Sequence, residues 1–270
     1  MEVLVGVGAL LLIWLITFTV SQIKISKRKK LMAMPLSDEQ QQILERNLKI
    51  YKKLPEDLRG KLSGLINLFI NEKDFTGCNG LEITDEIKVT IAAQACLLLL
   101  NNKTQPWYKK LHTVLVYPSA YKAFNISDED GIISEEENIL LGESCDGGSI
   151  VLSWSHSLKG GMDFGDGENV VLHEFAHQLD EDADGTPQMA DFSCYVSWAK
   201  VLSRHYKRLV KKAMKNQATL LDKYGATNEA EFFAVATECF FEKPRQMKKK
   251  HPKLYAELSK YYGLNPADWV

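Results

Sequence analysis

The chain has 270 residues, with 33 Lys or Arg and 35 Asp or Glu, so its formal net charge is −2. Because positive charge is not in excess overall, direct binding of nucleic acid is not expected. The hydrophobic fraction of 45% and the charged fraction of 25% are those of a folded globular protein and exclude a disordered chain. The five cysteines are scattered, odd in number and without a C-x-x-C pair, so they are expected to be reduced thiols.

The first segment in chain order is apolar, because residues 3–20 include no charged side chain. A helix of that length spans about 27 Å, close to the thickness of the hydrocarbon core of a bilayer. No basic residue precedes the segment and no small-x-small site follows Val20, so a cleavable signal peptide is not favoured. The positive charges that follow directly are Lys24, Lys27, Arg28, Lys29 and Lys30.

This pattern predicts a single-pass membrane protein whose N-terminus lies outside, since the positively charged flank stays in the cytoplasm. Residues 1–22 are expected to form the transmembrane anchor and residues 23–36 a basic juxtamembrane linker. Residues 37–270 are then expected to form one cytoplasmic domain, for which about 240 residues are sufficient.

Helices dominate the predicted secondary structure of this domain. Ser37 and Gln40 have the spacing of a capping box, and Pro55 is suited to a first helical position. The segment from Thr84 to Leu100 is strongly apolar and is expected to be a central helix. The predicted helices cover residues 37–53, 55–71, 84–100, 169–180, 191–215, 228–241 and 252–262.

Two short strands are predicted, at residues 112–117 and 149–153, the second after a Gly-Gly turn. The second strand precedes the helix that carries the candidate site described next. It is either an edge strand, which could add an extended peptide to the sheet, or a purely internal strand. The acidic segment 128–137 is expected to be a solvated loop. The fold class is therefore α+β, mainly helical, with a small sheet.

Residues 169–180, N-V-V-L-H-E-F-A-H-Q-L-D, contain an H-E-x-x-H motif on a predicted helix. His173 and His177 are four residues apart and therefore lie on one face of that helix. Two imidazoles in this arrangement can bind one Zn²⁺, and Glu174 beside them could take a proton from a metal-bound water. The motif predicts a zinc hydrolase; the alternative is a helix with two core histidines.

A catalytic zinc site needs a third protein ligand. In the metzincin pattern Gly and His stand where this chain has Asp180 and Ala183, so that class is excluded. The apolar helix predicted at 228–241 offers Glu231 and Glu238, two turns apart and near one face. Burial of a carboxylate is costly unless it is paired or bound to a metal. Both remain candidates, whereas Glu229 lies near the start of the helix and is expected to cap it.

Three segments together resemble the Mlc titration factor A family of zinc-dependent peptidases. The first is V-V-L-H-E-F-A-H-Q-L-D, and the second is L-L-G-E-S-x-D-G-G-x-I-V-L-S-W at 140–154, where Cys145 replaces the usual Trp. The third is G-L-E-I-T-D-E-I-K-V-T-I-A-A-Q-A-C-L-L-L-L at 80–100. The likeness extends in order from about residue 50 to about 245. Residues 224–234, Y-G-A-T-N-E-A-E-F-F-A, are also similar to the catalytic domain of anthrax lethal factor.

Both groups are gluzincins, so the resemblance implies a zincin-like metallopeptidase fold in residues 37–270. It implies Zn²⁺ bound by His173, His177 and Glu231, with the hydroxyl of Tyr224 near the metal. On this assignment Glu238 does not bind the metal; it either packs in the protein interior or contacts one of the metal-binding side chains.

The resemblance predicts a membrane-anchored metallopeptidase that cleaves a peptide or protein substrate with water activated by Glu174. The rival prediction is a regulatory binding protein. Mlc titration factor A binds a transcriptional repressor of sugar-uptake genes and relieves repression, so a membrane-anchored relative could sequester a transcriptional regulator, with proteolysis secondary.

Overall fold

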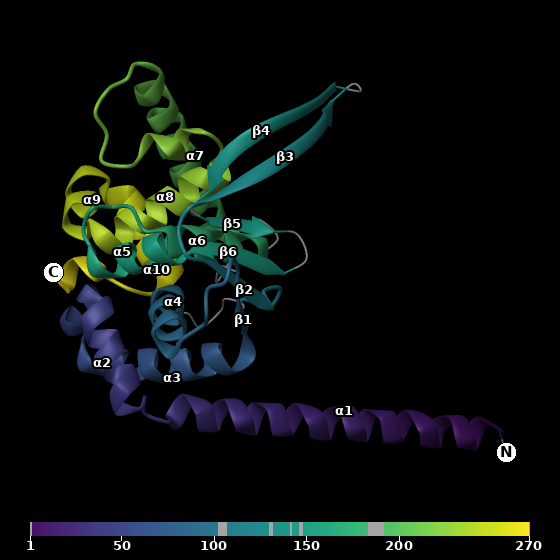
Figure 1. The fold of residues 1–270 in the computed structure, drawn as a ribbon. Coiled ribbons are helices and arrows are strands. Elements are labelled where there is room, and N and C mark those ends of the chain that lie inside the picture. The colour runs from purple at the N-terminus through teal and green to yellow at the C-terminus, as the bar shows by residue number, and fades with distance from the viewer. Residues whose placement is uncertain are drawn as a thin grey trace.

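The computed structural model describes residues 2–101, 107–129, 132–140, 142–145, 148–182 and 192–269, with side chains from residue 13 onwards except at 121–147 and 192–193. Helices predominate and a small sheet lies to one side of them, so the predicted α+β class is confirmed (Figure 1).

The N-terminal helices agree with the predicted boundaries to within a few residues. Ser37 accepts a hydrogen bond from the backbone N–H of Gln40, and the Gln40 side chain accepts one from the backbone N–H of Ser37, so the capping box is confirmed. The helix predicted at 37–53 is interrupted because Leu48 has extended backbone angles. The elements are α1 (Glu2–Ala33), α2 (Asp38–Asn47), the 3-10 helix η1 (Lys49–Lys53), α3 (Glu56–Glu72) and α4 (Asp85–Leu97).

The sheet has four strands in the order β1-β2-β6-β5. They are β1 (Asp74–Gly77), β2 (Thr113–Tyr117), β5 (Gly142–Cys145) and β6 (Ser149–Ser153). The first three in spatial order are parallel, and β5 runs antiparallel to β6. Both predicted strands are confirmed, as β2 and β6. Because β6 pairs on both sides it is an internal strand, and the edge strands are β5 and β1.

A separate hairpin is formed by β3 (Tyr121–Glu129) and β4 (Ile132–Leu140), which pair antiparallel and project from the rest of the chain (Figure 1). The prediction of a loop at 128–137 is therefore wrong for the described residues. The error arose because the segment is rich in acidic residues, whereas the backbone pairing of a hairpin does not depend on apolar side chains.

The C-terminal half is mostly helical and shares one buried core with the N-terminal helices. Its elements are α5 (Trp154–Met162), α6 (Val170–Asp182), α7 (Phe192–Met214), η2 (Lys223–Ala226), α8 (Glu229–Glu242), α9 (Pro244–Lys250), α10 (Pro252–Tyr262) and η3 (Pro266–Asp268). Helix α6 packs against α8. The fully buried ring of Phe175 on α6 contacts Phe69 and Tyr108, with ring centroids 5.6 and 4.9 Å away. Helix α6 is thus fixed between α8 and the N-terminal helices.

Helix α1 corrects the prediction of a membrane protein. Within the described residues, no helix combines the length and the apolar character needed to cross a membrane. The described side chains of α1 are uncharged only up to Ile23, and charged residues follow from Lys24 to Lys30. That basic part is docked on α3, where Arg28 donates two hydrogen bonds of 2.6 and 2.5 Å to Glu72. The predicted single-pass membrane location, with residues 1–22 as its anchor, is therefore wrong.

Candidate metal centre

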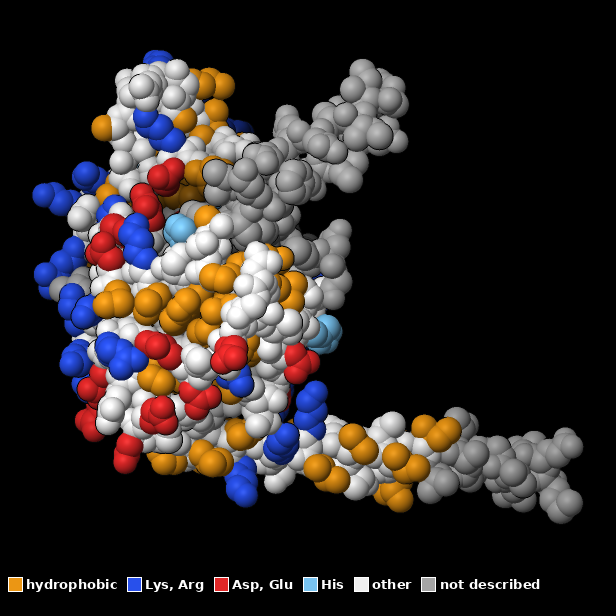
Figure 2. All heavy atoms as spheres, viewed as in Figure 1, with side chains coloured by type: hydrophobic (Ala, Val, Ile, Leu, Met, Phe, Trp, Pro, Cys, Tyr) orange, Lys and Arg blue, Asp and Glu red, His pale blue; other side chains and the backbone are white. Residues whose placement is uncertain are grey.

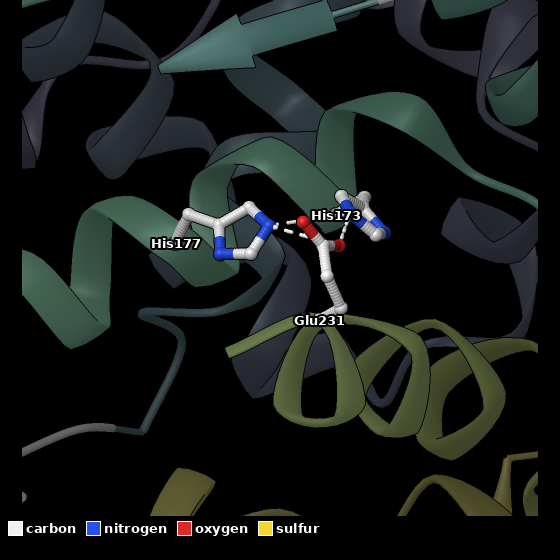
Figure 3. A group of neighbouring side chains, drawn as sticks. All are labelled: His173, His177 and Glu231. Carbon is white, nitrogen blue, oxygen red and sulfur yellow. Dashed lines mark hydrogen bonds and ion pairs between the residues drawn. The ribbon is translucent and has the colours of Figure 1, made fainter. Parts of the chain in front are cut away.

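Two helices position the three side chains that the sequence predicts as zinc ligands. His173 and His177 lie on one face of α6, and Glu231 reaches them from the first turn of α8 (Figure 3). The start of α8 is fixed by its N-cap, because the Asn228 side chain accepts a hydrogen bond of 2.9 Å from the backbone N–H of Glu231. The cap therefore fixes the backbone position from which the Glu231 side chain extends towards α6.

The donor atoms of these side chains are close enough to share one ion. His173 Nε2 lies 3.2 Å from His177 Nε2 and 2.9 Å from Glu231 Oε2, and His177 Nε2 lies 3.4 Å from that oxygen. Two ligand atoms of a tetrahedral zinc site are about 3.3 Å apart when each bond is 2.0–2.1 Å. The three residues present therefore fit a zinc ion, and three protein ligands is the number typical of catalytic zinc.

Glu238 lies behind this group and contacts His173 on its other side. The Nδ1 atom of His173 is 3.0 Å from Glu238 Oε2, while Glu238 Oε1 accepts a hydrogen bond of 2.7 Å from the backbone N–H of Asn169. A carboxylate on Nδ1 favours the tautomer with its proton there, which leaves Nε2 free to bind a metal. Of the two glutamates left open by the helical pattern, Glu231 is the one placed at the donor group.

The sequence reading missed the polar network at the start of α6. The Asn169 side chain accepts a hydrogen bond of 3.0 Å from the backbone N–H of Leu172 and so caps the helix. Its amide nitrogen donates to Gln94 on α4 and to Glu242 on α8, at 3.0 and 3.1 Å. The helix-capping role could have been recognised, since Asn directly precedes an apolar helical run. The partners could not, because they lie far away in the sequence.

The imidazoles and carboxylates of this group shift one another's pKa values. Burial alone would lower the pKa of His173, but its hydrogen bonds with Glu231 and Glu238 raise that pKa to about 10. Burial would likewise raise the pKa of Glu231, but the two imidazoles bring it down to about 2. In this state the Glu231 carboxylate is ionised and held by hydrogen-bonded imidazoles, as expected of a carboxylate that binds a cation.

Glu174 occupies a different environment from the other acids. Its side chain is on α6 beside His173 and only 7% of the residue is exposed. Burial raises the pKa of Glu174 to about 7, against the opposing effect of both histidines. A carboxyl group with a pKa near neutrality can both accept and return a proton at neutral pH.

Tyr224 reaches the same region from η2. Its ring centroid is 5.9 Å from that of His173, and 56% of the residue is exposed. Partial burial and the carboxylates of Glu231 and Glu174 raise the pKa of the Tyr224 phenol, so the group stays protonated at neutral pH. The backbone N–H of Tyr224 donates to Asp222 at 2.7 Å, which fixes the turn that carries the ring. The Tyr224 ring thus lies beside that of His173, and the role of its hydroxyl stays a prediction.

A pocket of about 370 Å³ lies between α7 and α8. Its lining includes Asp180, three residues beyond His177, and Ala230, which directly precedes Glu231. Aromatic side chains form most of the remaining wall: Tyr195, Trp198, Tyr206, Phe232 and Phe233. A cavity of this size and character can hold one large side chain of a ligand. The sequence has Cys145 where the family usually has Trp. The side chain of Cys145 lies outside the described residues, so the structure gives no reason for this difference.

Comparisons with known proteins agree with this geometry. The family described as glucose-regulated metallo-peptidase M90 matches residues 23–263. An uncharacterised protein of Synechocystis sp. is 40% identical over 245 residues, which is 89% of each chain. Mlc titration factor A of Escherichia fergusonii is 28% identical over 224 residues, covering 80% of this chain and 83% of its own.

Mlc titration factor A of Klebsiella pneumoniae is 29% identical over 213 residues, covering 76% of this chain and 79% of its own. These matches confirm the predicted resemblance to that family. The likeness of residues 224–234 to anthrax lethal factor stays a prediction.

Proposed function

Since the chain belongs to the family of glucose-regulated metallo-peptidases M90, a family of metallopeptidases, we propose that it is a zinc-dependent peptidase whose catalytic domain spans residues 37–270. The observation that carries the proposal is the meeting of His173, His177 and Glu231 within hydrogen-bonding distance of one another. We propose these three as the zinc ligands and a gluzincin-type fold for the domain. The substrate class is peptides or proteins.

The chain's own residues divide the chemistry among them. A bound zinc ion would supply a Lewis acid that lowers the pKa of water. Glu174 accepts the proton of the water that attacks the peptide carbonyl, and passes it to the leaving amine. The Tyr224 hydroxyl donates a hydrogen bond to the oxygen on which negative charge develops. Glu238 holds His173 in the tautomer that keeps its Nε2 atom available. The pocket between α7 and α8 takes a side chain of the substrate.

Removal of the metal is expected to abolish peptide hydrolysis, and added Zn²⁺ to restore it. The full-length protein is treated with a chelator and assayed with a library of fluorogenic peptides, while bound metal is counted by elemental analysis. We expect one zinc per chain, and little in His173→Ala or His177→Ala because two ligands hold the ion weakly. Undiminished zinc in both variants, or hydrolysis that survives chelation, would contradict the proposal.

Replacement of Tyr224 by Phe is expected to slow peptide cleavage by about 10²–10³, the usual effect of losing one donor to the developing oxyanion. The metal content should stay at one per chain, because the hydroxyl is not among the proposed ligands. Steady-state kinetics should show the loss in kcat with little change in KM. Tyr51→Phe, which removes a tyrosine hydroxyl on η1 outside the proposed centre and pocket, is the matched control. Unchanged turnover in Tyr224→Phe would remove the role given to this hydroxyl.

A second candidate function is supported by the name of the relatives, Mlc titration factor A. By analogy, the chain would bind a transcriptional regulator and withdraw it from its target, with peptidase activity secondary. The two candidates differ in their need for Glu174. A binding protein keeps its cellular effect when Glu174 is replaced by Gln, whereas a peptidase loses it.

A further inference from the structure

Helix α7 carries two neighbouring groups of basic side chains, and Arg208 lies where they meet. Its charged residues from Lys200 to Lys212 are all positive, and one group forms an exposed row at Arg204, Lys207 and Lys211. The second group, Arg208 and Lys212, lies on the same helical face as His205, at spacings of three and four residues. Lys212 is half-buried, whereas Lys211 beside it is exposed. Arg208 is exposed, so Lys212 is the more deeply placed of the two.

The second group lines a pocket of about 420 Å³ formed by three elements. Arg208 and Lys212 come from α7, Thr219 from the segment between α7 and η2, Lys250 from the end of α9, and His251 follows it. In Figure 2 Lys and Arg side chains gather along the side of the molecule where Figure 1 places α9. Three cations from two separate helices thus converge on one concave site.

None of these three cations forms an ion pair with a carboxylate anywhere in the described part of the chain. The neighbouring lysines offer a contrast, since Lys248 on α9 lies 3.8 Å from Asp268. Like charges held close together repel, so a cluster without an internal counter-ion is stabilised when an anion binds.

The imidazole of His251 gives an independent indication of a missing partner. Its Nδ1 atom is buried and has no hydrogen-bond partner. Buried polar atoms are nearly always paired, so an unpaired one indicates a water, an ion or a ligand group beside it. His251 also lines a smaller cavity of about 20 Å³ that shares Arg208, Lys212 and Thr219 with the pocket. That space is about the size of one water molecule.

The electrostatics of both histidines here are dominated by positive neighbours. Burial, the ring of His205 and the cations Lys212, Arg208 and Lys250 lower the pKa of His251 to about 4. Burial also lowers the pKa of His205, only partly opposed by its hydrogen bond to the Val201 carbonyl, and Arg208, Arg204 and Lys253 lower it further. An anion in the pocket would act in the opposite direction on both imidazoles.

We propose that the pocket between α7 and α9 is an anion site that binds the phosphate group of a small ligand through Arg208, Lys212 and Lys250. A guanidinium and two ammonium groups provide the charge-assisted donors that phosphate oxygens require. The volume exceeds what one phosphate fills, so the ligand carries a further group such as an organic moiety or a second phosphate. The site is separate in its residues from the proposed metal centre and does not depend on the peptidase proposal.

The experiment is a calorimetric titration of the full-length protein with inorganic phosphate and with pyrophosphate, at constant ionic strength adjusted with chloride. Lys212→Gln and Lys250→Gln are each expected to weaken binding by at least about tenfold, as loss of a direct charged donor does. The matched controls Lys211→Gln and Lys249→Gln remove the same charge one residue away and should change binding less than about twofold. In parallel, NMR should show the pKa of His251 rising by about one unit or more in phosphate.

Three outcomes would overturn the proposal. Equal weakening by Lys211→Gln and Lys212→Gln would show diffuse attraction to a basic surface. Loss of binding in His173→Ala, with full binding in Lys212→Gln, would place phosphate at the metal centre. No heat and no change in His251 would mean that these cations only complement the C-terminal dipole of α7.

Discussion

Replacement of Glu231 by Ala is expected to empty the metal centre and abolish peptide hydrolysis together. The two imidazoles that remain cannot complete the set of three protein ligands that catalytic zinc needs. The carboxylate is also the group that holds both histidines in place, since its Oε2 atom lies 2.9 Å from His173 and 3.4 Å from His177. Zinc content of the purified full chain, measured beside its activity, tests this directly.

Glu238→Gln is the matched control, because it changes a carboxylate on the same helix two turns further on. Glu238 contacts Nδ1 of His173 and not the group of donor atoms. The variant should still bind zinc, with an affinity lowered about 10–100-fold, the usual effect of changing a group that orients a metal-bound histidine. If Glu238→Gln empties the centre while Glu231→Ala stays loaded, the proposed assignment of the two glutamates is reversed.

Replacement of Glu174 by Gln is expected to slow hydrolysis by about 10³ or more while leaving the metal bound. Gln has nearly the same shape but cannot accept the proton of the attacking water, and such a base contributes about 10²–10⁴. Only 7% of Glu174 is exposed, so a base from the solvent has little access to take over its role. Single-turnover kinetics with a cleavable peptide, together with zinc analysis, should show lost chemistry in a loaded site.

The same variant separates the two candidate functions in cells. Comparison of newly formed protein termini between wild type and Glu174→Gln should reveal substrates that are cut only by wild type. If no terminus differs, and the variant retains the full cellular effect, the regulatory binding function is favoured over proteolysis.

Much of the site could be predicted because two of its residues are close together in the sequence. His173 and His177 are brought together by a single helical turn, and the apolar pattern around Glu231 identified a buried helix with few positions for a carboxylate. The choice between Glu231 and Glu238 was different. Both are near the α6 histidines, and only the packing of α8 on α6 decides which one meets Nε2 and which meets Nδ1.

The parts that the sequence did not predict depend on distant partners. The short strand β1 is defined by pairing with β2, and the hairpin β3–β4 by pairing with itself, so neither has a strong pattern of its own. The network of Asn169 with Gln94 and Glu242 joins residues about 75 positions apart. The apolar N-terminal run led instead to the prediction of a feature that the structure does not support, because hydrophobicity at a terminus was taken to mean a membrane span.

The separation of the donor atoms along the chain has a consequence for synthesis. Glu231 is 58 residues beyond His173, and the histidines alone provide only two of the three proposed ligands. A nascent chain that has produced α6 but not α8 therefore has no complete metal centre. Other nascent chains and the chain's own unfolded segments would be protected from cleavage until α8 docks. In the proposed peptidase, the order of the ligands along the chain would therefore delay activity until late in folding.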